Sequence, residues 1–286
     1  MNNVDTTEVL LGFDGSPPAA TAVEAAVALI PRAHAWVVNL WVPPFASDAM
    51  RRRLWTGSRD AGTFVAAIER EGEHEAGRLT SMGVTLARAG GWSAEPYLRR
   101  CYGGEGLEFS VLADKLGADV VVIGSRGLRG ARAVLDSVSD VIVHYCSRPV
   151  LVVPHPLLTA EYAALSDGPV VVGWDGSAGA SAALRAAAQL FPGRELLTAV
   201  VDDGAGTEPP PDGQPPVHLD RDHGPAGRAV AAALGDHARA NHAAVLVVGT
   251  RGRSVAQEIL LGSVAMAAVH NAHRPVLVVP ASRPLS

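Results

Sequence analysis

Short apolar runs alternate along the chain with Ala-rich amphipathic segments. In the first part of the chain, the runs predict strands and the segments between them predict helices. The predicted strands are 9–13, 36–42, 95–100, 119–123 and 149–153, and the predicted helices are 18–29, 62–89, 105–116 and 137–145. The strand runs are apolar throughout, so both faces of the sheet are expected to be covered. This pattern predicts an α/β fold with a parallel, doubly wound sheet.

The second part of the chain repeats the first. Three blocks recur in the same order: 9–16 matches 170–177, 120–127 matches 245–252, and 148–154 matches 274–280. The strands predicted for the second copy are 170–174, 195–201, 217–220, 245–248 and 275–279. Matched blocks in one order indicate a duplicated domain. We expect one domain over 1–156, a connector over 157–168, and a second domain over 169–286.

The second copy is shorter than the first. Asp14 and Asp175 are 161 residues apart, whereas Gly124 and Gly249 are only 125 apart, so 36 residues are missing between these blocks. The missing piece corresponds to the helix near 60–89. A Pro- and Gly-rich stretch, 207–216, stands in its place and predicts a surface loop without regular structure. The second domain is therefore expected to lack one helix.

Composition excludes several classes of protein. The 286 residues carry a formal charge of −5, and the densest cationic run is Arg51–Arg53, too short for a nucleic-acid surface. No run reaches the roughly 18 apolar residues of a membrane-spanning helix, and the N-terminus does not resemble a signal peptide. Cys101 and Cys146 lie in dissimilar settings, without disulfide or zinc spacing. We expect a cytoplasmic protein with no membrane or nucleic-acid partner.

Polar residues follow two of the predicted strands in each copy. They lie at the carboxyl ends of these strands, where parallel sheets bind ligands. One is Asp14 or Asp175 after the first strand, and the other is the Gly-Ser/Thr-Arg-Gly loop after the fourth. Glycines let backbone N–H groups approach a phosphate, and a helix starting at Ser263 adds its own N–H groups and dipole. Ser263 also suits an N-cap. Taken singly, the glycine loop is a common turn and Asp-Gly-Ser an ordinary turn with a helix cap.

These motifs together resemble the universal stress protein family, across essentially the whole chain. ATP-binding members carry Gly-x2-Gly-x9-Gly-(Ser/Thr), a pattern matched by Gly249, Gly252, Gly262 and Ser263. The resemblance implies two tandem Rossmann-like domains, each a five-stranded parallel sheet of order 3-2-1-4-5 flanked by helices. It also implies that the domains pair within the chain through their last strands, 149–154 and 275–280.

The resemblance further implies ATP, with Mg²⁺, as the ligand of the second domain. Asp175 would meet the adenine, and the backbone near Val200 would flank the base or ribose. The other implied ATP-binding residues are Val248, Gly249, Arg251, Gly252, Gly262, Ser263 and Val264. The matching positions, in a weaker first site, are Asp14, Val42, Gly124, Arg126, Gly127, Ser137 and Val138.

The first copy departs from the family pattern. Asp136 stands where the family has glycine, and the preceding segment is one residue short. A carboxylate at a helix N-terminus stabilises the helix but competes with a phosphate for the same dipole. We expect the first site to bind nucleotide weakly or not at all.

No motif predicts an enzyme. The only lysine is Lys115, so neither glycine loop is a Walker loop, and no nucleophile elbow is present. His144 and His270 occupy equivalent positions near helix C-termini, where capping is the expected role. The cluster of His218, Asp220, Asp222 and His223 is more typical of a solvated loop than of a metal site. We expect nucleotide binding with at most very slow ATP hydrolysis, and no bound metal of its own.

Two functions of different class fit these residues. In one, the protein is a stress-response sensor in which bound ATP alters a surface recognised by an unknown protein partner. In the other, it is a protein–protein interaction module whose pockets no longer bind nucleotide. Binding of another adenine nucleotide, such as cyclic AMP, is a third possibility. Two chains are also expected to form a homodimer.

Overall fold

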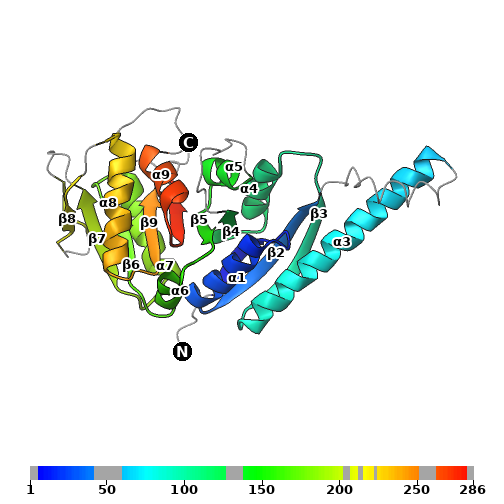
Figure 1. Cartoon of the computed structure of the whole chain (residues 1–286), viewed down its shortest axis with the longest axis horizontal. Helices are drawn as coiled ribbons and strands as arrows, with labels where there is room; N and C mark the ends of the chain where they lie inside the picture. Colours follow the sequence, from blue (N-terminus) through cyan, green and yellow to red (C-terminus); the bar gives the residue numbers. More distant parts are fainter. Residues whose placement is uncertain are drawn as a thin grey trace.

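The structure, a computed structural model, describes residues 6–41, 60–126, 138–201, 207–211, 215–221, 224–250 and 262–281. Within these residues the strands form a single ten-stranded sheet, in the order β3-β2-β1-β4-β5-β10-β9-β6-β7-β8. The first half of the chain supplies one side of this sheet and the second half supplies the other (Figure 1).

The elements of the first half lie close to their predicted positions. The strands are β1 (Thr7–Gly12), β2 (Ala33–Trp41), β3 (Ser93–Arg100), β4 (Val120–Arg126) and β5 (Val150–His155). The helices are α1 (Pro17–Leu29), α3 (Ala61–Ala89), α4 (Glu105–Lys115) and α5 (Val138–Tyr145).

The second half repeats this succession in shorter form. Its strands are β6 (Val170–Gly173), β7 (Leu196–Val201), β8 (Val217–Leu219), β9 (Val245–Gly249) and β10 (Val276–Val279). Its helices are α7 (Ala178–Leu190), α8 (Ala226–Ala240) and α9 (Ser263–Asn271). A short helix that the sequence pattern did not predict, α6 (Thr159–Ala164), lies in the connector between the halves.

Each half has the strand order 3-2-1-4-5, and its strands pair in parallel, which confirms the predicted fold class. The halves meet through their last strands, as the family resemblance implied. There the pairing is antiparallel, with Leu151 opposite Leu277 and Val150 opposite Val278. Because each last strand covers the other's edge, neither is exposed to pair with another chain.

Helices cover both faces of the sheet, as the continuously apolar strands require. One core lies between the sheet and α1, α3 and α7, and the other lies between the sheet and α4, α5, α8 and α9. Both cores contain residues from both halves. Among the described residues, no helix is long and apolar enough to span a membrane.

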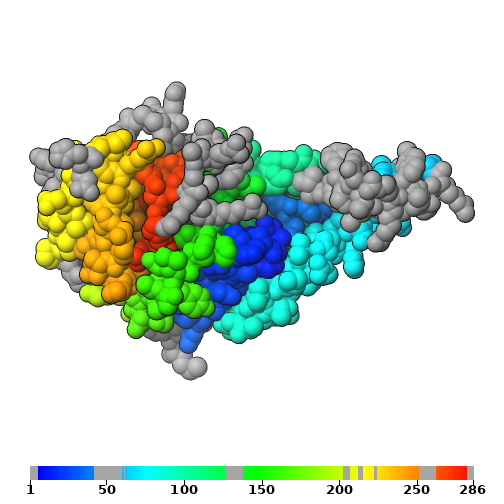
Figure 2. Space-filling view, viewed as in Figure 1, coloured from blue at the N-terminus to red at the C-terminus, as the bar shows by residue number. Residues whose placement is uncertain are grey.

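Helix α3 extends past the edge of the sheet. Its C-terminal part packs on β2 and β3, where Val84 and Ala87 are buried. Its N-terminal part projects from the main body beyond β3 (Figure 2).

The second half has no helix at the place of α3 in the residues that the structure describes. Between β7 and β8 the described residues, 207–211 and 215–216, have no regular structure. The Trp174 indole N–H donates to the Glu208 carbonyl at 2.7 Å and holds this stretch beside the end of β6.

Candidate functional site

Two cavities lie at the carboxyl ends of the strands, at equivalent places in the two halves. The first, of about 210 Å³, is lined by residues from the ends of β1, β2 and β4 and from α4 and α5. The second, of about 330 Å³, is lined by residues from the ends of β6, β7 and β9 and from α8 and α9. Strand order changes direction between β1 and β4 and again between β6 and β9, where parallel sheets bind ligands.

The second cavity collects most of the predicted ATP-binding residues. Those that line it are Asp175, Val248, Gly249, Gly262, Ser263 and Val264. The Val200 side chain does not: it is buried in the core beneath α7, while its neighbours Ala199 and Val201 line the cavity. Arg251 and Gly252 lie outside the described residues.

Gly262 and Ser263 form the start of α9. Gly262 is the N-cap residue, and its N–H donates to the Thr250 carbonyl at 2.6 Å. A Cβ at Gly262 would lie 2.8 Å from that carbonyl, so a side chain there would force a shift. Ser263 is the first helical residue, which corrects the prediction that it caps the helix. No side chain caps α9, and the positive end of its dipole faces a cavity that Ser263 lines.

The first glycine of each predicted loop has a packing role. A Cβ at Gly249 would lie 2.7 Å from the backbone carbonyl of Gly179 in α7. In the first half, a Cβ at Gly124 would collide with the Pro18 carbonyl in α1. Both glycines therefore allow a strand end and a helix backbone to touch, whether or not a phosphate binds nearby.

The two Asp-Gly-Ser motifs form matching turns. The Asp14 carboxylate accepts from the Ser16 N–H at 2.9 Å, and the Asp175 carboxylate accepts from the Ser177 N–H at 3.0 Å. Each serine then caps the helix that follows. The turn places an aspartate at the wall of each cavity.

The first cavity contains three of the residues predicted for the weaker site, namely Asp14, Gly124 and Val138. Arg126 ends β4, and its side chain is not among those described. Val42, Gly127 and Ser137 lie outside the described residues, and so does Asp136, on which the predicted weakness depends.

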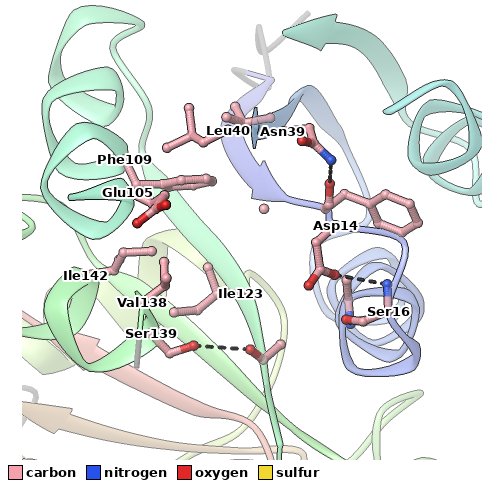
Figure 3. A pocket seen from close by; sticks show the side chains of 15 residues that line it. Asp14, Ser16, Asn39, Leu40, Glu105, Phe109, Ile123, Val138, Ser139 and Ile142 are labelled. Carbon is pink, nitrogen blue, oxygen red and sulfur yellow. Dashed lines mark hydrogen bonds between the residues drawn. The ribbon is translucent and has the colours of Figure 1, made fainter. Parts of the chain in front are cut away.

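Strand register corrects one predicted equivalence. Gly12 lies opposite Val38, and Gly173 lies opposite Ala199. The next residue along each strand is Asn39 in the first half and Val200 in the second, so Asn39, not Val42, is the counterpart of Val200. Asn39 is buried, and its side-chain amide donates to the Phe13 carbonyl at 2.9 Å (Figure 3).

Two charged residues that sequence reasoning missed line the cavities. Glu105, the first residue of α4, lines the first cavity across from Asp14 (Figure 3). Arg221, which follows β8, lines the second cavity together with Asp175. Among the described lining residues, the first cavity thus carries two carboxylates and no cation, whereas the second carries one of each sign.

A glycine pair shows which residue of the second half corresponds to Glu105. Gly106 in α4 and Gly227 in α8 let each helix pack closely on the next, because an added Cβ would lie 2.5 Å from the Cβ of Val141 or Ser263. They form a fourth matched pair of the repeat. Aligning them pairs Glu105 with Ala226, the first residue of α8.

The two equivalent histidines have different partners. His144 lies in the last turn of α5, and its Nδ1 contacts the carbonyl of Asp140, four residues earlier, at 2.8 Å. His270 reaches across the junction of the halves instead, with Nε2 3.6 Å from the Asp140 carboxylate and 2.9 Å from Met266 Sδ. Neither ring contacts one of the last four carbonyls of its own helix, so these contacts do not show the predicted capping.

Neither the cysteines nor the acidic cluster adds chemistry to the cavities. Cys101 and Cys146 are buried and unpaired with each other, and burial raises the pKa of the Cys146 thiol to about 11. His218 and Asp220 are exposed beside β8, while Asp222 and His223 lie outside the described residues. In the part of the chain that the structure describes, no group of His, Cys, Asp and Glu is arranged to hold a metal ion.

Comparison with known proteins identifies the family. The model of the universal stress protein family matches residues 6–154 and 207–280. No curated protein matches the chain.

Solved structures share the whole architecture. A universal stress protein from Archaeoglobus fulgidus superposes with a TM-score of 0.67 at 19% identity, covering 96% of this chain and 98% of its own. A protein of unknown function from Pseudomonas aeruginosa PAO1 has a TM-score of 0.55 at 12% identity, covering 98% of this chain and 94% of its own. A putative universal stress protein from Pseudomonas aeruginosa UCBPP-PA14 has a TM-score of 0.54 at 13% identity, covering 98% of this chain and 95% of its own. At these identities the likeness describes the fold alone.

Proposed function

The chain belongs to the universal stress protein family, and we propose that it binds ATP in the cavity of its second half and acts as a nucleotide-dependent sensor. The observation that carries the proposal is that Gly249 at the end of β9 and Gly262 and Ser263 at the start of α9 line one cavity of about 330 Å³. These are three of the four residues in the ATP-binding pattern that they match.

The cavity has chemically different ends. At the α9 end, the N-terminal N–H groups and helix dipole favour an anion, so the phosphates lie there. Arg221 follows β8, three strands away from β9 in the sheet, a separation of about 14 Å at about 4.8 Å per strand. The base and ribose therefore lie between Asp175 and Arg221, where a guanidinium can stack on a purine face.

Mg²⁺ accompanies ATP in this proposal by binding the phosphates. The cavity offers Ser263 as a neutral oxygen near them and has Asp175 as its only carboxylate among the described lining residues. In this proposal ATP is retained, with at most very slow hydrolysis. A bound nucleotide would contact the start of α9, and that surface is what a protein partner would recognise.

A specific observation favours the interaction-module alternative. Gly249 and Gly124 are both required by contacts with helix backbones, so these glycines would persist in a protein that had lost its nucleotide. Binding measurements separate the two functions.

Titration calorimetry of ATP with Mg²⁺ into nucleotide-stripped protein tests the proposal. We expect one ATP per chain and no binding by Gly262→Asp, which places a carboxylate at the uncapped start of α9. Gly262→Asn is the matched control, because it forces the same shift at Thr250 without the charge and should weaken binding less. Absence of ATP binding in the wild-type protein, with no nucleotide retained on purification, would leave the interaction module.

Arg221→Ala tests the orientation of the nucleotide. Loss of a cation–π contact of about 1 kcal/mol predicts roughly fivefold weaker ATP binding. Arg228→Ala, an exposed arginine of α8 outside the cavity, should leave the affinity unchanged. Competition with cyclic AMP in the same assay shows which adenine nucleotide the cavity prefers; displacement of ATP by equimolar cyclic AMP would contradict ATP as the ligand.

A further inference from the structure

The first cavity carries two carboxylates among its polar and apolar side chains. The Asp14 and Glu105 carboxylates supply acceptors, whereas the Asn39 side chain donates only one of its two amide N–H groups to Phe13. Of the two hydroxyl groups at its wall, Ser139 donates to the Gly124 carbonyl at 3.4 Å (Figure 3), whereas Ser16 accepts from the Ala19 N–H at 3.4 Å and keeps its own O–H. A ligand that satisfies the two carboxylates must bring donors.

Glu105 distinguishes this cavity from its counterpart. The structural repeat pairs it with Ala226, so the second cavity has a methyl group where the first has a carboxylate. Glu105 is also the first residue of α4, where its charge is stabilised by the helix dipole. Its carboxylate lines the cavity together with Val138 at the start of α5, which corresponds to the start of α9.

A phosphate fits this wall poorly. It brings negative charge and acceptor oxygens to a cavity that already holds two carboxylates, and no described lining residue is a cation. Like charges placed together cost several kcal/mol in recognition sites. The second cavity has Arg221 and no carboxylate at the position of Glu105.

We infer that the first cavity binds a nucleoside without phosphate, and that Glu105 is the residue that excludes phosphorylated ligands. The inference rests on the proposed function in that both cavities are taken to hold the same base class. Hydroxyl and amino groups of the nucleoside donate to Asp14 and Glu105, and its base lies against Leu40 and Phe109. The smaller volume, about 210 Å³ against about 330 Å³, suits a ligand that has lost its phosphates.

The number of sites per chain for each ligand tests this assignment, and it is measured in the wild-type protein. Calorimetric titration of the full chain should give two sites for adenosine and one for AMP. 5′-Amino-5′-deoxyadenosine, which carries a cation where AMP carries its phosphate, should bind the first cavity at least about tenfold more tightly than AMP does. Equal occupancy of both cavities by AMP in the wild-type protein would overturn the inference.

Removing the carboxylate from the first cavity and adding one to the second gives a reciprocal test. Glu105→Gln removes the charge while keeping the shape and should create a second AMP site. Ala226→Glu installs the carboxylate in the second cavity and should weaken AMP binding there at least about tenfold, with adenosine affected much less. Glu108→Gln, which removes a carboxylate of α4 that pairs with Arg99 outside the cavity, is the control and should change neither stoichiometry. One AMP per chain in Glu105→Gln would overturn the role of Glu105.

Asp14→Asn assigns the adenosine sites. Asparagine keeps one oxygen for the Ser16 N–H but replaces an acceptor with a donor, so one adenosine site should be lost and the AMP site retained. Adenosine binding at one site that Asp14→Asn leaves intact would refute the first-cavity assignment while the proposed function stands. Adenosine binding that Asp14→Asn abolishes, without any AMP or ATP binding, would refute the proposed function and leave this inference standing.

Discussion

At the scale of single residues, the glycines of the nucleotide motif have two roles that the sequence pattern does not separate. Gly262 stands at the uncapped start of a helix, where a phosphate would approach. Gly249 stands where β9 touches the backbone of α7 at Gly179. A loss of nucleotide binding on mutation therefore has a different meaning at each position.

Replacing Gly249 should destabilise the fold itself. Gly249→Ala places a Cβ 2.7 Å from the Gly179 backbone, and overpacking of this kind costs about 1–3 kcal/mol. Urea denaturation followed by circular dichroism measures this cost as a lower midpoint.

Gly235→Ala is the matched control for Gly249→Ala. Gly235 lies within α8, and an added Cβ meets nothing within 4 Å. Alanine should raise the free energy of unfolding there by about 0.5–1 kcal/mol. Equal effects of the two substitutions would show that the contact between β9 and α7 is not tight.

At the scale of elements, the helices that follow the first strand of each half begin in the same way. Asp-Gly-Ser turns the chain, with Gly15 and Gly176 at φ values of +78° and +75°, and the serine then caps the helix. The motif has this local function in both halves, independent of any ligand. Its aspartate lies at the wall of a cavity because the turn ends a central strand.

The two serine caps should differ in strength. Ser177 accepts from the Ala180 N–H at 3.1 Å, whereas the equivalent Ser16 contact to Ala19 is 3.4 Å. Ser177→Ala should lower the free energy of unfolding by about 1 kcal/mol, and Ser16→Ala should lower it less. Thermal denaturation of both variants checks the order, which a larger loss for Ser16→Ala would contradict.

At the scale of the whole molecule, the junction between the halves joins two domains into one sheet. β5 and β10 pair edge to edge, and each core continues across the junction. The contact between His270 and Asp140 crosses the same junction. The halves are therefore coupled by burial and not only by the connector.

This coupling predicts that the two halves unfold together. Trp174 is the only tryptophan of the second half, so in Trp174→Phe the fluorescence reports the first half alone, while circular dichroism reports the whole chain. The two signals should give one coincident urea transition, because a half that unfolds first would expose the apolar edge of the other. Separate midpoints would show that the halves are independent.

The sequence by itself determined the α/β class, the duplication, the positions of most elements and the family. These follow from local patterns: apolar runs, amphipathic spacing and short motifs such as Gly249 to Ser263 carry their own signal. It also located Asp14, Asp175 and the start of α9, since each lies directly after or before a predicted element. The connector helix α6 was missed because six residues carry too little periodicity to be recognised.

The tertiary structure alone decided which other side chains reach the cavities. Glu105 and Arg221 lie outside the family motif, and they become cavity residues only because α4 and β8 are folded beside the central strands. Strand register decided that Asn39, and not Val42, is the counterpart of Val200. The local sequence of a strand does not say which residue of the neighbouring strand lies opposite each of its own residues. Contacts between distant segments, such as Gly249 with Gly179 and His270 with Asp140, depend on packing that no short stretch of sequence encodes.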